Sequence, residues 1–148
     1  MAKKLDMIGW SEMISLPELG IGAIKVKVDS GARTCALHAT KVKIKSGPDG
    51  QDWAHFTVVA DKNNGHQIRT KAPLLGRRKV RSSMGHVTIR PVIVTRIQIG
   101  SESWPVEVTL VNRDPMGFRM LLGRASLKGR YVIHPNRRFL VSRPQEIE

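Results

Sequence analysis

Four consecutive residues, Asp29, Ser30, Gly31 and Ala32, have the types and order that could carry acid–base chemistry. Apolar residues alternate with lysines over residues 24–28, a pattern that predicts a strand ending directly at the Asp29 carboxylate. The Ser30–Gly31 pair favours a tight turn, because glycine tolerates positive φ and a serine hydroxyl bonds to nearby backbone. Taken alone, Asp-Ser-Gly is more typical of an Asx-type turn than of a catalytic site.

A second segment, the Met-Leu-Leu-Gly-Arg run at residues 120–124, precedes a short helix that we predict over residues 123–128. Together the two segments resemble the retropepsin family of aspartic proteases. In that family one chain supplies an Asp-Thr/Ser-Gly-Ala run near its start and an apolar-apolar-Gly-Arg segment before its only helix. The resemblance covers residues 21–127 and implies a mostly β fold, a closed barrel with one short helix after Gly123.

A longer string is more specific. Residues 28–39, together with Gly9-Trp10, residues 15–20 and residues 121–124, resemble a bacterial retropepsin-like family whose name refers to an ATP-dependent zinc protease. This match covers nearly the whole chain. Members of that family are associated with a ligase that adds glutamates to the tail of a ribosomal protein.

The resemblance implies a role for each matching residue. Asp29 would activate the water, with Ser30, Gly31, Ala32, Gly123 and Arg124 supporting the active site. Hydrolysis by this route needs two carboxylates that share a proton, and the chain contains a single Asp-Ser-Gly. We therefore expect a homodimer in which two Asp29 side chains meet across a two-fold axis. The pair should titrate as a unit and give a bell-shaped rate profile.

Arg33 departs from the pattern of the retroviral enzymes, which carry an acidic residue at that position to pair with the arginine after the glycine. Here Arg33 and Arg124 would repel each other. Either the dimer is braced differently, or these arginines are kept free to attract anionic groups of the substrate. Residues 77–85 fall where a flap should lie, which adds Arg77, Arg78 and Arg81 to the predicted substrate-binding residues. The predicted function is an aspartic endopeptidase that acts on acidic, glutamate-rich segments.

No pattern of residues supports the zinc or the ATP in that family name. The five histidines form no His-Glu-x-x-His motif, and the Cys35–His38 pair lacks partners at a known ligand spacing. The chain has no Gly-x-x-x-x-Gly-Lys-Ser/Thr loop for a nucleotide. We therefore expect no metal and no cofactor, with Cys35 packing as a small hydrophobic residue.

The elements that hold these segments are predicted to be strands within one domain, residues 1–148. Alternation or apolar runs place strands at residues 24–28, 42–44, 56–59, 87–99, 106–110, 131–133 and 139–141. Residues 56–59 would return from residues 42–44 through a turn at residues 47–50. Pro91 leaves open whether residues 87–99 form one strand or two.

The composition is strongly basic, with 25 Lys and Arg against 12 Asp and Glu and a net charge of +13. An acidic partner is therefore expected, and the runner-up function is a basic β-rich module that binds RNA or the ribosome without catalysis. A third reading is a catalytically silent dimer that binds peptides. Asp29→Asn separates these readings, because it should abolish proteolysis and leave RNA affinity unchanged.

The chain contains no apolar run of the ~20 residues that a membrane span requires. Its one cysteine excludes a disulfide scaffold and suits a reducing compartment. The sequence therefore predicts a cytoplasmic protein without membrane contact.

Overall fold

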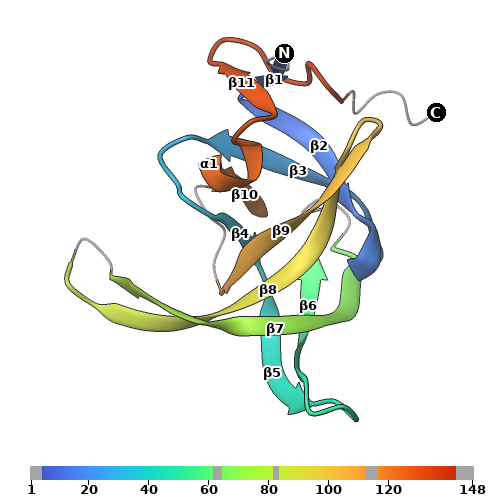
Figure 1. Ribbon diagram of the computed structural model, residues 1–148, viewed down its shortest axis with the longest axis vertical. Coiled ribbons are helices and arrows are strands. Elements are labelled where there is room, and N and C mark those ends of the chain that lie inside the picture. The colour runs from blue at the N-terminus through green and yellow to red at the C-terminus, as the bar shows by residue number, and fades with distance from the viewer. Residues whose placement is uncertain (1–4, 62–64, 82–83, 113–116, 143–148) are drawn as a thin grey trace.

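The computed structural model describes residues 5–61, 65–81, 84–112 and 117–142, and strands dominate these ranges (Figure 1). The strands are β1 (Asp6–Gly9), β2 (Ser11–Leu16), β3 (Ile21–Asp29), β4 (Cys35–His38), β5 (Thr40–Ser46), β6 (Asp52–Val59), β7 (Gln67–Arg81), β8 (Val87–Ile99), β9 (Glu102–Val111), β10 (Met120–Gly123) and β11 (Tyr131–His134). The described helical segments are the 3-10 turn η1 (Pro17–Leu19) and the helix α1 (Arg124–Leu127). A mostly β chain with one short α-helix after Gly123 is therefore confirmed.

The main sheet closes on itself. Its strand order within the described residues is β2-β3-β10-β4-β9-β8-β7-β6-β5, and β2 also pairs with β8 where Ser15 stands opposite Gln98. The first six strands of this order therefore form a ring, which is the closed arrangement that the sequence leads us to expect. β1 and β11 form a separate parallel pair.

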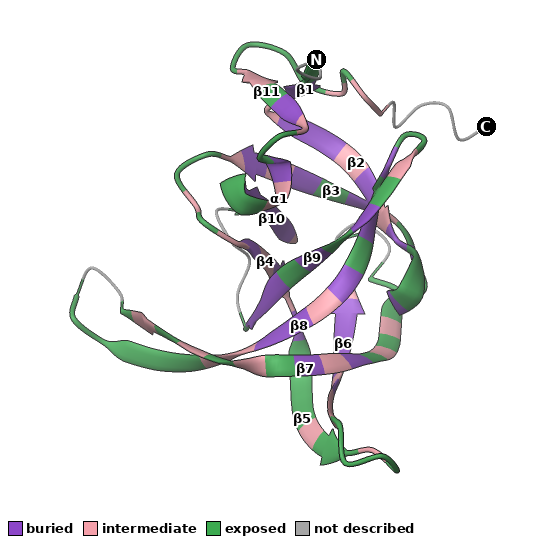
Figure 2. Ribbon diagram, viewed as in Figure 1, coloured by how far each residue is buried: buried purple, intermediate pink, exposed green. Residues whose placement is uncertain are grey.

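Alternating side chains explain why the ring has an apolar interior. On β3, Ile24, Val26 and Val28 are at most 6% exposed, whereas Lys25 faces solvent. The same alternation buries Ile93, Ile97 and Ile99 on β8. Figure 2 shows buried residues concentrated along the ring strands and exposed residues along β5 and the outer part of β7 and β8.

The two hairpins confirm one predicted turn and settle whether residues 87–99 form one strand or two. β5 and β6 pair around the predicted turn, in which the Gly47 N–H donates to the Gln51 carbonyl at 2.7 Å. β8 is one strand of 13 residues, and Pro91 keeps its place opposite Arg77 of β7. Beyond that point the β7–β8 hairpin extends away from the ring as an arm (Figure 1). Its residues Val87 and Ile89 are 50% and 61% exposed, although they continue the alternation that is buried further along β8.

The strand predicted at residues 139–141 is wrong. Phe139 has a φ of 55°, which interrupts an extended backbone, and the following amides bond to a side chain instead of a neighbouring strand. The N–H groups of Leu140, Val141 and Ser142 donate to the Glu12 carboxylate at 2.9–3.3 Å. A buried carboxylate therefore takes the place of a strand partner for this segment.

None of the helices in the described ranges has the length and apolar character of a membrane span.

Candidate active site

Asp29 is the last residue of β3, the strand whose alternating pattern the sequence predicts. The neighbouring strand β10 runs parallel to β3, with Leu122 opposite Val28 and Gly123 opposite Asp29. On its other edge β10 pairs with β4, so that it lies between two strands that are early in the chain. This insertion brings the two segments that carry the resemblance side by side.

The Asp29 carboxylate is held by its own turn. Its Oδ1 accepts a hydrogen bond from the Gly31 N–H at 2.9 Å, and its backbone carbonyl accepts from the Ala32 N–H at 3.2 Å. The Asx-type turn expected for an isolated Asp-Ser-Gly is therefore present, and it fixes one carboxylate oxygen. Within the described part of the chain, Oδ2 has no hydrogen-bond partner. That oxygen remains available to a water molecule or a second carboxylate.

Gly123 passes directly behind this turn. A Cβ at position 123 would lie 2.8 Å from the Cα of Thr34 and would overlap the Thr34 carbonyl group. Two backbone bonds lock the contact: the Arg124 N–H donates to the Ala32 carbonyl at 2.8 Å, and the Ala125 N–H donates to the Arg33 carbonyl at 3.0 Å. The start of α1 is thereby fastened to the loop that follows Asp29.

The Arg124 side chain folds back over the same loop. Its Nη1 donates to the carbonyls of Ser30 and Gly31 at 3.3 and 3.4 Å. Arg33 and Arg124 line one hollow, with Lys128 among the other residues at its wall. Both arginines are exposed, so water weakens their mutual repulsion while leaving their charge accessible.

The predicted flap arginines divide between the two faces of the β7–β8 arm. Arg78 lines a second hollow that it shares with Arg33, and it lies 3.4 Å from the Glu107 carboxylate. Arg77 and Arg81 alternate with Arg78 along β7, opposite Pro91 and Val87, and neither lines these two hollows. The structure therefore brings Arg33, Arg78 and Arg124 around one region and directs Arg77 and Arg81 elsewhere. Residues 82–83 of the predicted flap lie outside the described residues.

Sequence reasoning missed two cations in this region. Lys128 lines both hollows, and Arg130 lines the second, where its guanidinium carbon lies 4.3 Å from the ring centre of Trp104. The Trp104 Nε1–H donates to the Ser126 carbonyl at 3.1 Å, which anchors the ring against α1. Their positive charge at the end of the predicted helix and just beyond it was a signal that could have indicated them.

Cys35 lies in the core behind the loop, 1% exposed, as the sequence predicts for a small hydrophobic residue. Burial raises the pKa of its thiol, and hydrogen bonding to Ser126 and to the Gly123 backbone offsets part of that rise. His38, three residues after Cys35 at the end of β4, has its Nδ1 2.7 Å from Nη1 of Arg119. Across residues 5–61, 65–81, 84–112 and 117–142, no three His, Cys, Asp or Glu side chains gather in a way that could hold a metal ion.

Comparison with known proteins supplies a family for this arrangement. Residues 7–144 match a family model described as the retropepsin-like aspartic endopeptidase RimB. The chain is 38% identical over 143 residues to a "Probable alpha-L-glutamate ligase" of Shewanella halifaxensis, covering 96% of this chain and 31% of that protein. It is 43% identical over 136 residues to one of the same name from Parasynechococcus marenigrum, covering 91% and 29%. The chain thus spans about a third of the length of these curated relatives.

A solved structure shares the fold. The crystal structure of a protein of unknown function from Legionella pneumophila superposes with a TM-score of 0.76. The two chains are 24% identical, and the match covers 93% of this chain and 99% of the other.

Proposed function

Because the chain belongs to the RimB-like family of retropepsin-like aspartic endopeptidases, we propose that it hydrolyses peptide bonds as a homodimer. Each protomer would contribute one Asp29 to the catalytic pair. The observation that carries this proposal is the state of the Asp29 carboxylate at the point where β3 pairs with Gly123: the Gly31 N–H holds one of its oxygens, and the other is open. A cytoplasmic location belongs to the same proposal, because a lone cysteine suits a reducing compartment.

The positions of other carboxylates support the proposal of a second chain. Several described acidic side chains are engaged elsewhere, by the C-terminal segment, by a backbone amide, by a tyrosine and by an arginine; these are Glu12, Glu18, Glu102 and Glu107. Hydrolysis through an aspartic pair requires two carboxylates that share one proton around a water molecule. A two-fold axis beside the open oxygen of Asp29 would supply the second from an identical chain.

The chemistry of such a pair divides between its members. The ionised carboxylate accepts a proton from the water as that water attacks the peptide carbonyl carbon. The protonated carboxyl donates its proton toward the carbonyl oxygen. As the C–N bond breaks, the carboxyl that took a proton from the water passes it to the leaving amine, and the diol hydroxyl returns a proton to the other carboxylate as the carbonyl re-forms. The turn bond from Gly31 to Asp29 keeps the carboxylate in one orientation, so little reorganisation is needed during the reaction.

We further propose that the substrate is an acidic peptide, such as a protein tail to which glutamates have been added. Arg33, Arg124 and Lys128 line a hollow beside the Asp29 loop, and no carboxylate lines it. A cleft with walls of one charge raises the local concentration of ligands of the opposite charge. The names of the relatives point in the same direction, because a ligase that adds glutamate creates the kind of substrate that this hollow would attract.

The substrate proposal is tested with two peptides of the same length at low salt, one containing a run of glutamates and one with glutamines at those positions. The glutamate peptide should be cleaved with the higher kcat/KM, and the advantage should shrink as salt is added. Arg33→Ala should reduce the advantage, with Lys25→Ala on the exposed face of β3 as the control for charge loss. Equal cleavage of both peptides by the unmodified protein would show that charge does not select the substrate.

The dimeric catalytic pair is tested by mixing subunits. Asp29→Asn chains should be inactive alone. When subunits exchange between dimers, a wild-type chain that pairs with an Asp29→Asn chain should also lose its activity. At an equal mixture the activity per wild-type chain should fall to about half, because about half of those chains then pair with an inactive partner. Activity per wild-type chain that stays constant as inactive chains are added would mean that the site needs only one protomer.

A further inference from the structure

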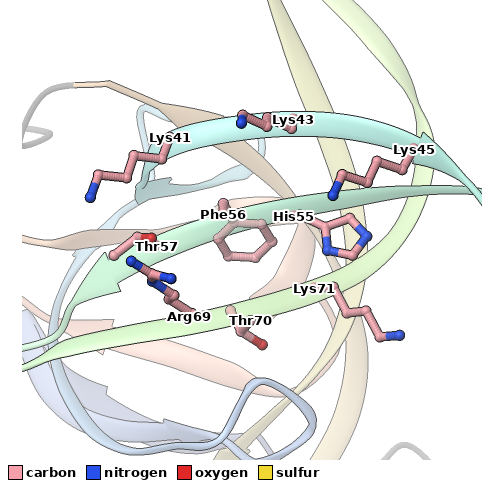
Figure 3. Close-up of a pocket in the computed structure, with 9 residues that line it drawn as sticks. All are labelled: Lys41, Lys43, Lys45, His55, Phe56, Thr57, Arg69, Thr70 and Lys71. Carbon is pink, nitrogen blue, oxygen red and sulfur yellow. The ribbon is translucent and has the colours of Figure 1, made fainter.

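A second basic region lies on the solvent face of β5, β6 and β7. Nine residues line an open hollow of about 580 Å³ there, and Figure 3 shows their side chains. Five of the nine are cations, and none is Asp or Glu; the cations, which together with His55 we call the basic face, are Lys41, Lys43, Lys45, Arg69 and Lys71. Because these cations gather on one surface, they indicate where an anionic partner would bind, which the net charge of the chain does not.

The strand register explains why these side chains gather. Lys43 stands opposite His55, which in turn stands opposite Lys71, so three basic side chains form one row across the three strands. Thr57 and Arg69 face each other one row further along. The opposite face of the same strands carries Ala54, Phe56, Val58, Ala72 and Leu74 in the core. Alternation therefore forces every cation of these rows to the same solvent side.

The cations come from two strands on either side of β6. β5 is the edge strand, and lysines on an edge discourage pairing with other chains. Arg69 and Lys71 lie on the part of β7 that pairs with β6, before the pairing of β7 with β8 begins at Leu74. Lys41 has a φ of 53° at a register shift between β5 and β6, an uncommon conformation for a residue other than glycine. Lys41 therefore holds this conformation at a position where its side chain lines the same hollow as Lys43 and Lys45.

An aromatic ring borders the basic face. Trp53 stands opposite Lys45, is half-buried, and lies under the Lys71 ammonium, with Nζ 5.3 Å from the ring centre. Trp53, His55 and Lys71 also line a neighbouring hollow, which has Asp49 at its wall. Nucleic-acid bases stack on such rings while lysines and arginines neutralise the phosphates. A run of glutamates would use the cations but would gain nothing from the ring.

The basic face is also separate from the candidate active site. Figure 1 places the β5–β6 hairpin at the lower end of the molecule, away from α1 and the end of β3. A peptide tail bound along β5–β7 would therefore not lie beside Asp29.

From the cation rows, the absence of acidic side chains from their hollow and the adjoining tryptophan, we propose that the basic face binds single-stranded RNA. The phosphates would lie along the Lys43–His55–Lys71 row, with a base against Trp53. This binding site is independent of the proteolytic function proposed above, and it gives the chain a second, nucleic-acid partner.

The test measures the Kd of a fluorescently labelled oligouridylate by anisotropy at several salt concentrations. The double variant Lys43→Ala/Lys71→Ala should raise the Kd about tenfold or more at low salt. The slope of log K against log salt should become shallower by roughly 1.4, since each lost phosphate contact on a single strand contributes about 0.7. Asp29→Asn should leave the Kd unchanged.

Control variants decide the interpretation. Lys25→Ala/Arg137→Ala removes the same charge from exposed positions away from the face and should change the Kd little; equal losses in both double variants would overturn the proposal in favour of net charge. Lys43→Arg/Lys71→Arg should retain binding.

The role of the ring is tested separately. Trp53→Leu should weaken RNA binding, whereas Trp53→Phe should retain it. If a polyglutamate peptide instead binds the face as tightly and Trp53→Leu has no effect on RNA, the face is a site for acidic peptides and the RNA proposal is wrong.

Discussion

At position 123 the backbone of Thr34 occupies the space that a side chain would need. We expect Gly123→Ala to destabilise the fold by about 1–3 kcal/mol or more, because the added methyl must displace backbone on both sides of the contact. Gly22→Ala is the matched control, since a Cβ there meets no atom within 4 Å. Urea unfolding of the two variants checks the prediction. Similar midpoints would show that the Thr34 backbone can move aside for a methyl group at position 123.

Cys35 offers a second test at the scale of one side chain. Burial raises the pKa of its thiol, so the reactive thiolate is scarcer than in an exposed cysteine. We expect iodoacetamide to leave the native protein unlabelled near pH 8 and to label it fully in urea. The labelling is followed by mass, and it is unambiguous because the chain has one cysteine. Rapid labelling without urea would mean that the loop behind Asp29 opens readily.

Among the elements, the C-terminal segment depends most on one side chain. The Glu12 carboxylate accepts hydrogen bonds from Gly9 at 2.7 Å, from the amides of residues 140–142 and from the Ser142 hydroxyl at 2.7 Å. Glu12 itself is fully buried. A carboxylate suits this position because it is an acceptor only, and every neighbour that faces it is a donor.

Glu12→Gln should therefore release the segment. The amide NH₂ of glutamine would face backbone N–H groups, and we expect a loss of about 2–4 kcal/mol in the free energy of unfolding. Hydrogen exchange should show the amides of Leu140 and Ser142 losing protection before the ring strands do. Glu18→Gln is the control, because exposed Glu18 accepts one bond, from the Arg96 N–H. Equal losses in the free energy of unfolding for both variants would show that the Glu12 carboxylate does not hold the C-terminal segment.

The same contact shows where sequence patterns stop being informative. The strands around residues 24–28 and 87–99 were predictable because alternation reflects one buried and one solvated face. Residues 139–141 have the same apolar character, but their amides find partners more than a hundred positions earlier. The Leu140 and Val141 amides donate to the Glu12 carboxylate, and the Phe139 amide donates to the Ser11 carbonyl. Likewise, Val87 and Ile89 alternate correctly yet project into solvent on the arm. Local pattern cannot report a partner that only the tertiary fold supplies.

For the candidate site, the sequence could predict the motif residues but not the side chains that the tertiary fold brings to them. The two motifs identify Asp29 and Gly123, and the parallel pairing of β3 with β10 explains why they occur together. The directions of Arg77 and Arg78 follow from the strand register of the arm, which the sequence alone does not fix. Lys128 and Arg130 were missed because nothing in the motifs marks the chain beyond the helix.

For the molecule as a whole, Tyr131 links stability to pH. Its hydroxyl donates to the Glu102 carboxylate at 3.2 Å, and burial together with the Glu102 charge raises the pKa of Tyr131 to about 12. In the unfolded chain this phenol ionises near pH 10. Above about pH 10 the unfolded chain loses a proton that the folded chain retains, so the stability it contributes is lost as pH rises toward about 12.

Tyr131→Phe removes this contribution. Between about pH 10 and 12 the wild-type free energy of unfolding should fall more steeply than that of the variant, as measured by urea titration at several pH values. The chain has one tyrosine, so the ultraviolet absorbance of tyrosinate reports this site directly. Parallel curves for the two proteins would show that Tyr131 ionises alike in both states.

The position of β10 between β3 and β4 also sets the order in which the molecule can form during synthesis. β3 and β4 have emerged by residue 38, yet the strand that joins them ends at residue 123. The early strands must wait for most of the chain, and closing so long a loop is entropically costly and slow. The loop after Asp29 is completed only when Gly123 docks against Thr34. A nascent chain therefore carries an unfinished candidate active site until nearly all of these strands have been made.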